Sequence, residues 1–85
     1  MNPESLSVRA MAMLRAIAAG RAEMACSSEP DLFFDGLASC DQSTAHLLSH
    51  YGLIRPARPG LLGQRVPVQL TDAARSLLAL PDSAA

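Results

Sequence analysis

The sequence has no tryptophan and no lysine, and its only aromatic residues are one tyrosine and two phenylalanines. Leucine, alanine, valine, isoleucine and methionine must therefore fill the hydrophobic core. No apolar run approaches the roughly 18 residues that a membrane-spanning helix needs. The N-terminus also lacks the basic start of a secretory signal. Together these absences predict a cytoplasmic protein with no membrane contact.

Cysteine is scarce, with Cys26 and Cys40 as the only two. In the cytoplasm we expect both to be free thiols rather than a disulfide. His46 and His50 stand four apart, which is a metal-ligand spacing on a helix, and the cysteines could complete a Cys₂His₂ set. The cysteines lie too far apart in sequence for the short knuckle of a zinc finger, so we expect no bound metal.

Catalytic signatures are also missing from the sequence. It contains no glycine-rich phosphate loop and no nucleophile elbow. Serine, histidine and aspartate occur, but without a spacing that indicates a catalytic set. The sequence therefore predicts a protein that is not an enzyme and that needs no cofactor.

A chain of 85 residues fits a single domain, 1–85, with an ordered core over about 3–80 and a tail at 81–85. A domain this small buries only about 60–65% of its unfolded surface, so the core is thin. The net charge is −1, but residues 42–71 hold three arginines and no acidic residue. This stretch is the natural place for an anionic partner.

The first part of the chain predicts a helix followed by a less certain segment. Residues 3–19 read as a helix capped by Asn2 and ended by Gly20. Residues 21–38 read either as a β-hairpin, with its turn at 27–31, or as a short helix from Ser28. We favour the hairpin. The apolar stripe expected on the first helix consists of Val8, Met11, Leu14 and Ile17, with Ala10 and Ala18 beside it.

The second part predicts a helix, a ribbon and a last helix. Ser39 and Gln42 have the spacing of a capping box, which starts a helix over 40–51. Residues 53–70 read as a two-stranded ribbon, in which Pro67 indicates an edge strand because it cannot donate to a ladder. Thr71 caps a helix from Asp72 to about Leu80. The inward face of helix 40–51 is expected to carry Thr44, Leu47, Leu48 and Tyr51.

Two stretches resemble the winged helix-turn-helix family, in particular bacterial regulators of the multiple-antibiotic-resistance type. They are HLLSHYGLIRP at 46–56, a helix that passes through glycine into a ribbon, and VPVQLTDAARSLL at 66–78, a strand that passes into a closing helix. Residues 21–38 depart from that family, whose helix-turn-helix has a clear first helix. The resemblance implies an α+β winged helix, a small bacterial or phage transcription regulator, and a homodimer on double-stranded DNA.

A recognition helix places its N-terminal residues against base edges in the major groove, while the wing contacts phosphates or the minor groove. Polar side chains on a helix and arginines on a loop are also common as merely solvated groups. The alternative function is therefore a winged-helix adaptor that binds a protein partner, and a small toxin or phage-encoded inhibitor is a third. The DNA-binding residues expected under the first hypothesis are Gln42, Ser43, His46, His50, Arg55, Arg58 and Arg65.

Overall fold

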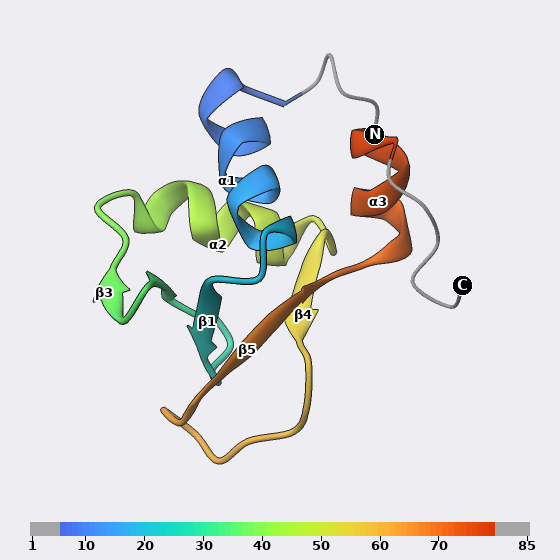
Figure 1. Cartoon of the computed structure of the whole chain (residues 1–85). Coiled ribbons are helices and arrows are strands. Elements are labelled where there is room, and N and C mark those ends of the chain that lie inside the picture. The colour runs from blue at the N-terminus through green and yellow to red at the C-terminus, as the bar shows by residue number, and fades with distance from the viewer. Residues whose placement is uncertain (1–5, 80–85) are drawn as a thin grey trace.

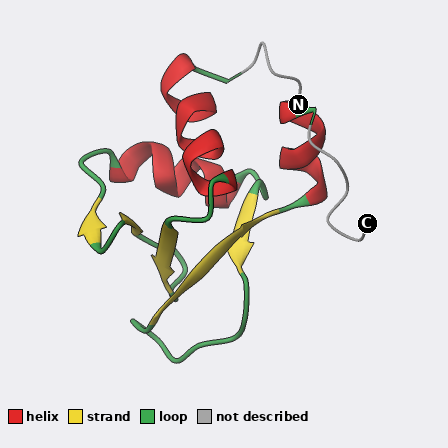
Figure 2. Ribbon diagram, in the orientation of Figure 1, coloured by secondary structure: helices red, strands yellow, loops and turns green. Residues whose placement is uncertain are grey.

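The computed structural model describes residues 6–79, which form a small compact α+β protein (Figures 1 and 2). Within these residues there are three helices and one five-stranded sheet. In chain order the elements are α1 (Val8–Ala18), β1 (Ala22–Ala25), β2 (Leu32–Phe34), β3 (Leu37–Ala38), α2 (Gln42–His50), β4 (Ile54–Pro56), β5 (Arg65–Leu70) and α3 (Asp72–Leu78).

The sheet is antiparallel throughout and has the strand order β3-β2-β1-β5-β4. Residues 21–38 form the predicted hairpin of β1 and β2, and the alternative helix from Ser28 is wrong. The structure adds β3, which returns from β2 through Asp35 and Gly36. Both residues have positive φ, 53° and 84°, as a two-residue type I′ turn requires. An Asp-Gly pair between apolar residues was therefore a signal for this second turn.

The hydrophobic core lies between the helices and one face of the sheet. Both α1 and α3 contact β5, while α2 contacts α1 and β4. Val66 and Leu70 alternate with exposed Arg65 and Pro67, as expected of a strand buried on one face. The core consists of Ala10, Met13, Leu14, Ile17, Ala22, Met24, Leu32, Ala45, Leu48, Leu53, Ile54, Val66, Leu70 and Ala74.

Helix α1 begins later than predicted. Ser7 is its N-cap, and the Ser7 hydroxyl accepts a hydrogen bond of 3.0 Å from the Ala10 amide. The expected cap at Asn2 lies outside the described residues. The apolar stripe is also displaced, since Met13 is buried while Val8 is 89% exposed and Ala18 is exposed. Gly20 follows the helix with φ of 85°, as predicted for its end.

Helix α2 is capped by Asp41, and the predicted capping box is wrong. The Asp41 carboxylate accepts from the Thr44 amide at 3.1 Å and from the Thr44 hydroxyl at 2.6 Å. The Ser39 hydroxyl instead accepts from the Asp41 amide. The buried face of α2 carries Ala45 and Leu48. Leu47 and Tyr51, which were expected to point inward, are each 49% exposed.

The ribbon of β4 and β5 is confirmed, but β5 is not an edge strand. It lies between β1 and β4, and Pro67 pairs with Glu23 of β1. In an antiparallel ladder, hydrogen-bonded and non-hydrogen-bonded pairs alternate. The Cys26 amide donates to the Gln64 carbonyl, so the Cys26–Gln64 pair is a hydrogen-bonded one. The Glu23–Pro67 pair lies three positions away and is therefore a non-hydrogen-bonded one. On its other side, toward β4, the Pro67 carbonyl accepts a hydrogen bond from the Ala57 amide. The β4–β5 ladder ends at this point because proline has no N–H to donate to Ala57 in return.

Helix α3 starts at the predicted cap, with the Thr71 hydroxyl accepting from the Ala74 amide. The same hydroxyl donates to the Gly52 carbonyl at 2.8 Å, which ties α3 to the end of α2. The helix ends at Leu78, where Ala79 has a left-handed φ of 56°. The predicted end at Leu80 and the tail at 81–85 lie outside the described residues. No helix within 6–79 is long and apolar enough to cross a membrane.

Candidate nucleic-acid interface

The outward face of α2 lies beside the tip of the β1–β2 hairpin. A hollow of about 500 Å³ is lined by Ser43, His46 and His50 of α2 and by Ser28 and Glu29 of the hairpin turn. Three of the four predicted α2 residues therefore share one concave surface. Ser43 and His50 are exposed there, and His46 is half-buried.

His46 is held by the hairpin turn. Its Nε2 atom lies within hydrogen-bond distance, 2.7 Å, of Oδ1 of Asp31. The second ring nitrogen, Nδ1, is the one that remains for an outside partner. The contact orients the ring and places a carboxylate beside it, so this part of α2 does not present a bare positive charge.

Gln42 does not belong to this surface, and its predicted outward position is wrong. Its Oε1 accepts from the Leu32 amide at 2.9 Å, and its Nε2 donates to the carbonyls of Leu32 and Ser39, each at 3.0 Å. Both the oxygen and the nitrogen of the Gln42 side-chain amide are thus hydrogen-bonded to the backbone of β2 and of the loop before α2. Gln42 could meet a base only by breaking these bonds, so we remove it from the candidate site.

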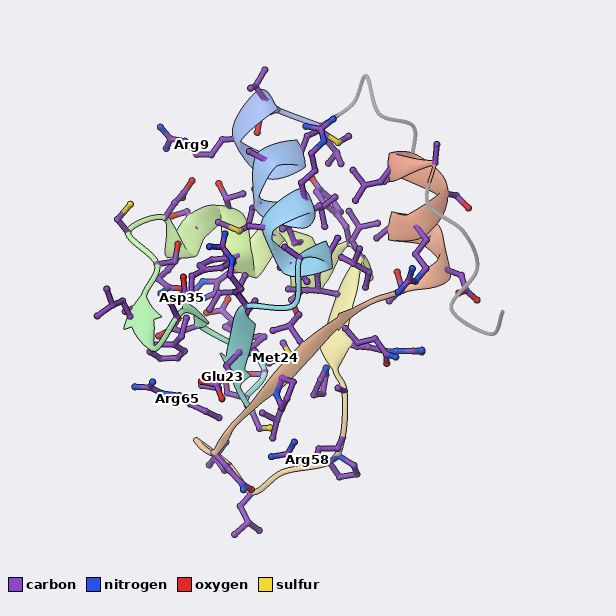
Figure 3. The ribbon with its side chains drawn as sticks, viewed as in Figure 1. Arg9, Glu23, Met24, Asp35, Arg58 and Arg65 are labelled. Carbon is purple, nitrogen blue, oxygen red and sulfur yellow. The ribbon has the colours of Figure 1, made fainter. Side chains whose placement is uncertain are left out.

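The three arginines of the acid-free stretch lie on the β4–β5 ribbon and its loop, and all are exposed. Figure 3 labels two of them, Arg58 and Arg65. The Arg55 Nε donates to the Gln69 side chain at 3.1 Å. The Arg65 guanidinium lies 3.8 Å from the centre of the Phe33 ring, a cation–π contact, and donates to the Gly36 carbonyl at 3.4 Å. Arg58 extends from the loop.

Among the residues that the structure describes, none of these ribbon arginines forms a salt bridge with a carboxylate. Arg9 and Arg21 differ, since they pair with Asp41 and Asp35 at 3.3 and 3.5 Å. The positive charge of the ribbon is thus not neutralised within the described chain, and it is the part of the surface best suited to an anion.

A second hollow, of about 310 Å³, connects α2 to the ribbon. Its lining includes Ser49 of α2, Pro30 of the hairpin turn, and Pro59 and Gly60 of the loop after β4. The polar face of α2, the hairpin turn and the loop therefore form one continuous surface. We use the name α2–ribbon face for the candidate residues of these two elements, namely Ser43, His46, His50, Arg55, Arg58 and Arg65. None of the three arginines lines either hollow. Arg65 alternates with buried Val66, so it projects from the face of the sheet opposite the core.

The residues considered as metal ligands are not brought together. Cys26 and Cys40 are free, one half-buried and the other exposed. Within 6–79, no group of three or more histidine, cysteine or acidic side chains is placed to hold a metal ion. The spacing of His46 and His50 on α2 thus has no completing ligands in the described structure.

Sequence reasoning missed Leu61 and Leu62, which lie in the loop between β4 and β5 and are 80% and 87% exposed. The sequence contained a signal for them, because two leucines between Gly60 and Gly63 lie in a short, glycine-flanked segment that cannot form a helix or strand to bury them.

Comparisons with protein-family models, with curated proteins and with solved structures find no match to this chain.

Proposed function

We propose that this protein is a winged-helix regulator that binds duplex DNA sequence-specifically through the α2–ribbon face. In this proposal α2 is the recognition helix and the β4–β5 ribbon, with its loop at 57–64, is the wing. The order of elements supports this assignment, since α2 passes through Gly52 directly into the ribbon and α3 follows the ribbon. The β1–β2 hairpin takes the place of the first helix of a helix-turn-helix.

The observation that carries the proposal is the set of arginines on the wing. Arg55, Arg58 and Arg65 are exposed, and among the described residues they have no carboxylate partner. Phosphates would supply the missing counter-charge. The Arg65 contact with Phe33 keeps the guanidinium in a defined place without neutralising it.

Each part of the face has a distinct role in this mechanism. The wing arginines bind phosphates and set the register, which carries no sequence information by itself. Ser43, His46 and His50 then approach the major groove, where hydroxyl and imidazole groups can bond base edges. A homodimer would double these few contacts and read two half-sites.

The test is fluorescence anisotropy with labelled duplexes at several salt concentrations. We expect a slope of log K against log salt of about −2 to −4 per monomer, because each phosphate contact releases about one counterion. Arg58→Ala should reduce that slope by about 1 and weaken specific and random duplexes alike. Arg15→Ala is the matched control, since Arg15 is an exposed arginine of α1, away from the face. No binding by the folded protein at about 50 mM salt would refute the proposal.

A second candidate function, a winged-helix adaptor for a protein partner, is favoured by one specific observation. The hairpin turn places Glu29 in the same hollow as the polar face of α2, and Asp31 adjoins His46. Carboxylates at this position would repel phosphates but suit a polar protein surface. Failure to bind duplex DNA together with saturable capture of one partner by the same face would select the adaptor.

A further inference from the structure

A hollow of about 430 Å³ lies between α1, β2 and the loop that leads into α2. Most of its lining is apolar, and that part comes from Ala12, Met13 and Ala16 of α1 and from Phe34 of β2. None of the residues that define the α2–ribbon face lines it. The hollow has room for a leucine side chain, since a cavity of about 150 Å³ already holds a molecule as large as benzene.

Leu37 of β3 is an apolar side chain beside this hollow, and it is 75% exposed. It pairs directly with Phe34 across the β2–β3 hairpin. Side chains of directly paired residues lie on the same face of a sheet. Because Phe34 lines the hollow and packs against the core, Leu37 lies next to the hollow on the helix-bearing face of the sheet. Figure 1 places β3 at the edge of the molecule, so the leucine projects outward there.

The position of Leu37 is fixed by the turn that precedes it. Asp35 and Gly36 form the tight two-residue turn between β2 and β3. Two arginines bond this turn, since Arg21 donates to the Asp35 carboxylate at 3.5 Å and Arg65 donates to the Gly36 carbonyl at 3.4 Å. The leucine is therefore held in place before any partner arrives, which reduces the entropy lost on association.

The charged groups around the hollow are balanced in sign. Arg9 pairs with Asp41 at 3.3 Å, and Arg21 pairs with Asp35 at 3.5 Å. A surface of one sign would repel a copy of itself in a symmetric interface and would instead attract a partner of the opposite charge. Because this surface carries both signs in equal number, it suits a second copy of the chain and not a polyanion such as nucleic acid.

We propose that this surface forms a twofold symmetric homodimer in which Leu37 of each copy enters the hollow of the other. A twofold interface uses the same patch on both partners, so every contact occurs twice. An apolar projection next to an apolar hollow is self-complementary under that symmetry, and a single association buries both leucines and fills both hollows. A different protein would have to supply a projection and a hollow of its own in the same arrangement. The function proposed above would use such a dimer, but the interface does not rest on that function.

The dimer is tested by sedimentation velocity of the full chain at increasing protein concentration, without DNA. The wild type should pass from monomer to dimer. Leu37→Ser should raise the Kd of the dimer at least about tenfold, because two leucines per dimer lose their apolar burial. Leu61→Ser is the matched control and should leave Kd unchanged, since Leu61 is 80% exposed but lies in the loop between β4 and β5.

Two further measurements address the hollow itself. Ala12 is an exposed lining residue, and the larger polar side chain of Ala12→Gln would occupy the space, so this variant should also raise Kd at least about tenfold. The exposed thiol of Cys40 lines the same hollow. Its alkylation by iodoacetamide, followed by mass spectrometry, should slow as the wild type dimerises but not in Leu37→Ser. Cys26 does not line this hollow, and its rate should stay the same.

The outcomes separate this dimer from other interfaces and from DNA binding. A folded wild type that stays monomeric at millimolar concentration refutes the dimer. Dimerisation that Leu37→Ser and Ala12→Gln leave unchanged, or that Leu61→Ser weakens equally, places the contact elsewhere and also refutes it. Circular dichroism establishes that each variant is folded. A failure to bind duplex DNA in the anisotropy experiment would reject the proposed function without affecting this result, because no DNA is present here.

Discussion

Replacing Gln42 by alanine should destabilise the protein, because the structure uses this side chain as a substitute for a neighbouring strand. The Met24–Leu32 pair of β1 and β2 is a non-hydrogen-bonded pair, since the adjoining Ala25 amide donates to Asp31. The Leu32 amide therefore faces away from β1 and finds its partner in the Gln42 oxygen, at 2.9 Å. Gln42 thereby joins the start of α2 to the sheet.

The magnitude follows from what each group loses in Gln42→Ala. Leu32 is fully buried, so its amide would be left without a partner in the interior, which costs about 1–3 kcal/mol. The Leu32 carbonyl keeps a bond from the Ser39 amide, and the Ser39 carbonyl loses one. We therefore expect a loss of about 2 kcal/mol in the free energy of unfolding and a fall in Tm of about 8–16 °C.

The assay is urea unfolding followed by circular dichroism, with Ser43→Ala as the control. Ser43 is the next residue of α2 and is exposed, so its substitution should change the free energy of unfolding by no more than about 0.5 kcal/mol. Gln42→Glu keeps an acceptor for Leu32 but has no donor for the two carbonyls, and it should also destabilise. If Gln42→Ala unfolds at the same urea concentration as Ser43→Ala, the joining role of Gln42 is refuted.

Three other predictions test neighbouring features. Leu48→Ala, at a position 1% exposed, should cost about 2–5 kcal/mol, whereas Leu47→Ala, 49% exposed, should cost less than about 1; equal melting temperatures would show that α2 packs through a different face. The hydrogen bonds from Thr44, followed by the charge of Arg9, hold the pKa of Asp41 below its ordinary value of 3.8. The stability that the ionised Asp41 contributes is therefore fully present above the pKa that Asp41 has in the unfolded chain, and it is lost as the pH falls through its pKa in the folded protein. In acid titrations, the difference in the free energy of unfolding between the wild type and Asp41→Asn should disappear over that pH range. Glu29→Gln should raise duplex affinity about two- to fivefold at low salt by removing a repulsion, and unchanged affinity would place Glu29 away from phosphates.

Sequence patterns located most elements because the chemistry that ends each element is local. Gly20 and Gly52 follow their helices with positive φ, and Thr71 caps the last helix as its position predicts. The hairpin and the ribbon follow from runs of alternating residues between turn residues. The position of a strand within the sheet is not local, so Pro67 was placed on an edge strand although β5 lies inside the sheet. Its missing N–H is tolerated where the ladder toward β4 ends.

The rotation of α2 about its axis was the error with the largest consequence for the site. Its sequence offers two apolar settings, one through Leu47 and Tyr51 and the other through Ala45 and Leu48. The second prevails because α2 packs against α1 and β4 with Ala45 and Leu48 buried, and because Gln42 fastens the start of the helix to β2. Both causes are contacts between distant segments, which a single helical pattern does not contain.

The distribution of charge around α2 also differs between the sequence and the folded structure. The stretch 42–71 has no acidic residue, but the hairpin turn brings Glu29 and Asp31 against the outward face of α2. The positive field that should attract DNA is therefore weakened over α2 and kept over the ribbon. On this basis the ribbon should govern the rate of association and its salt dependence, while α2 governs the choice of sequence. Substituting wing arginines should accordingly slow association with every duplex, whereas Ser43→Ala should change only the ranking of duplexes; the opposite result in stopped-flow measurements would exchange the two roles.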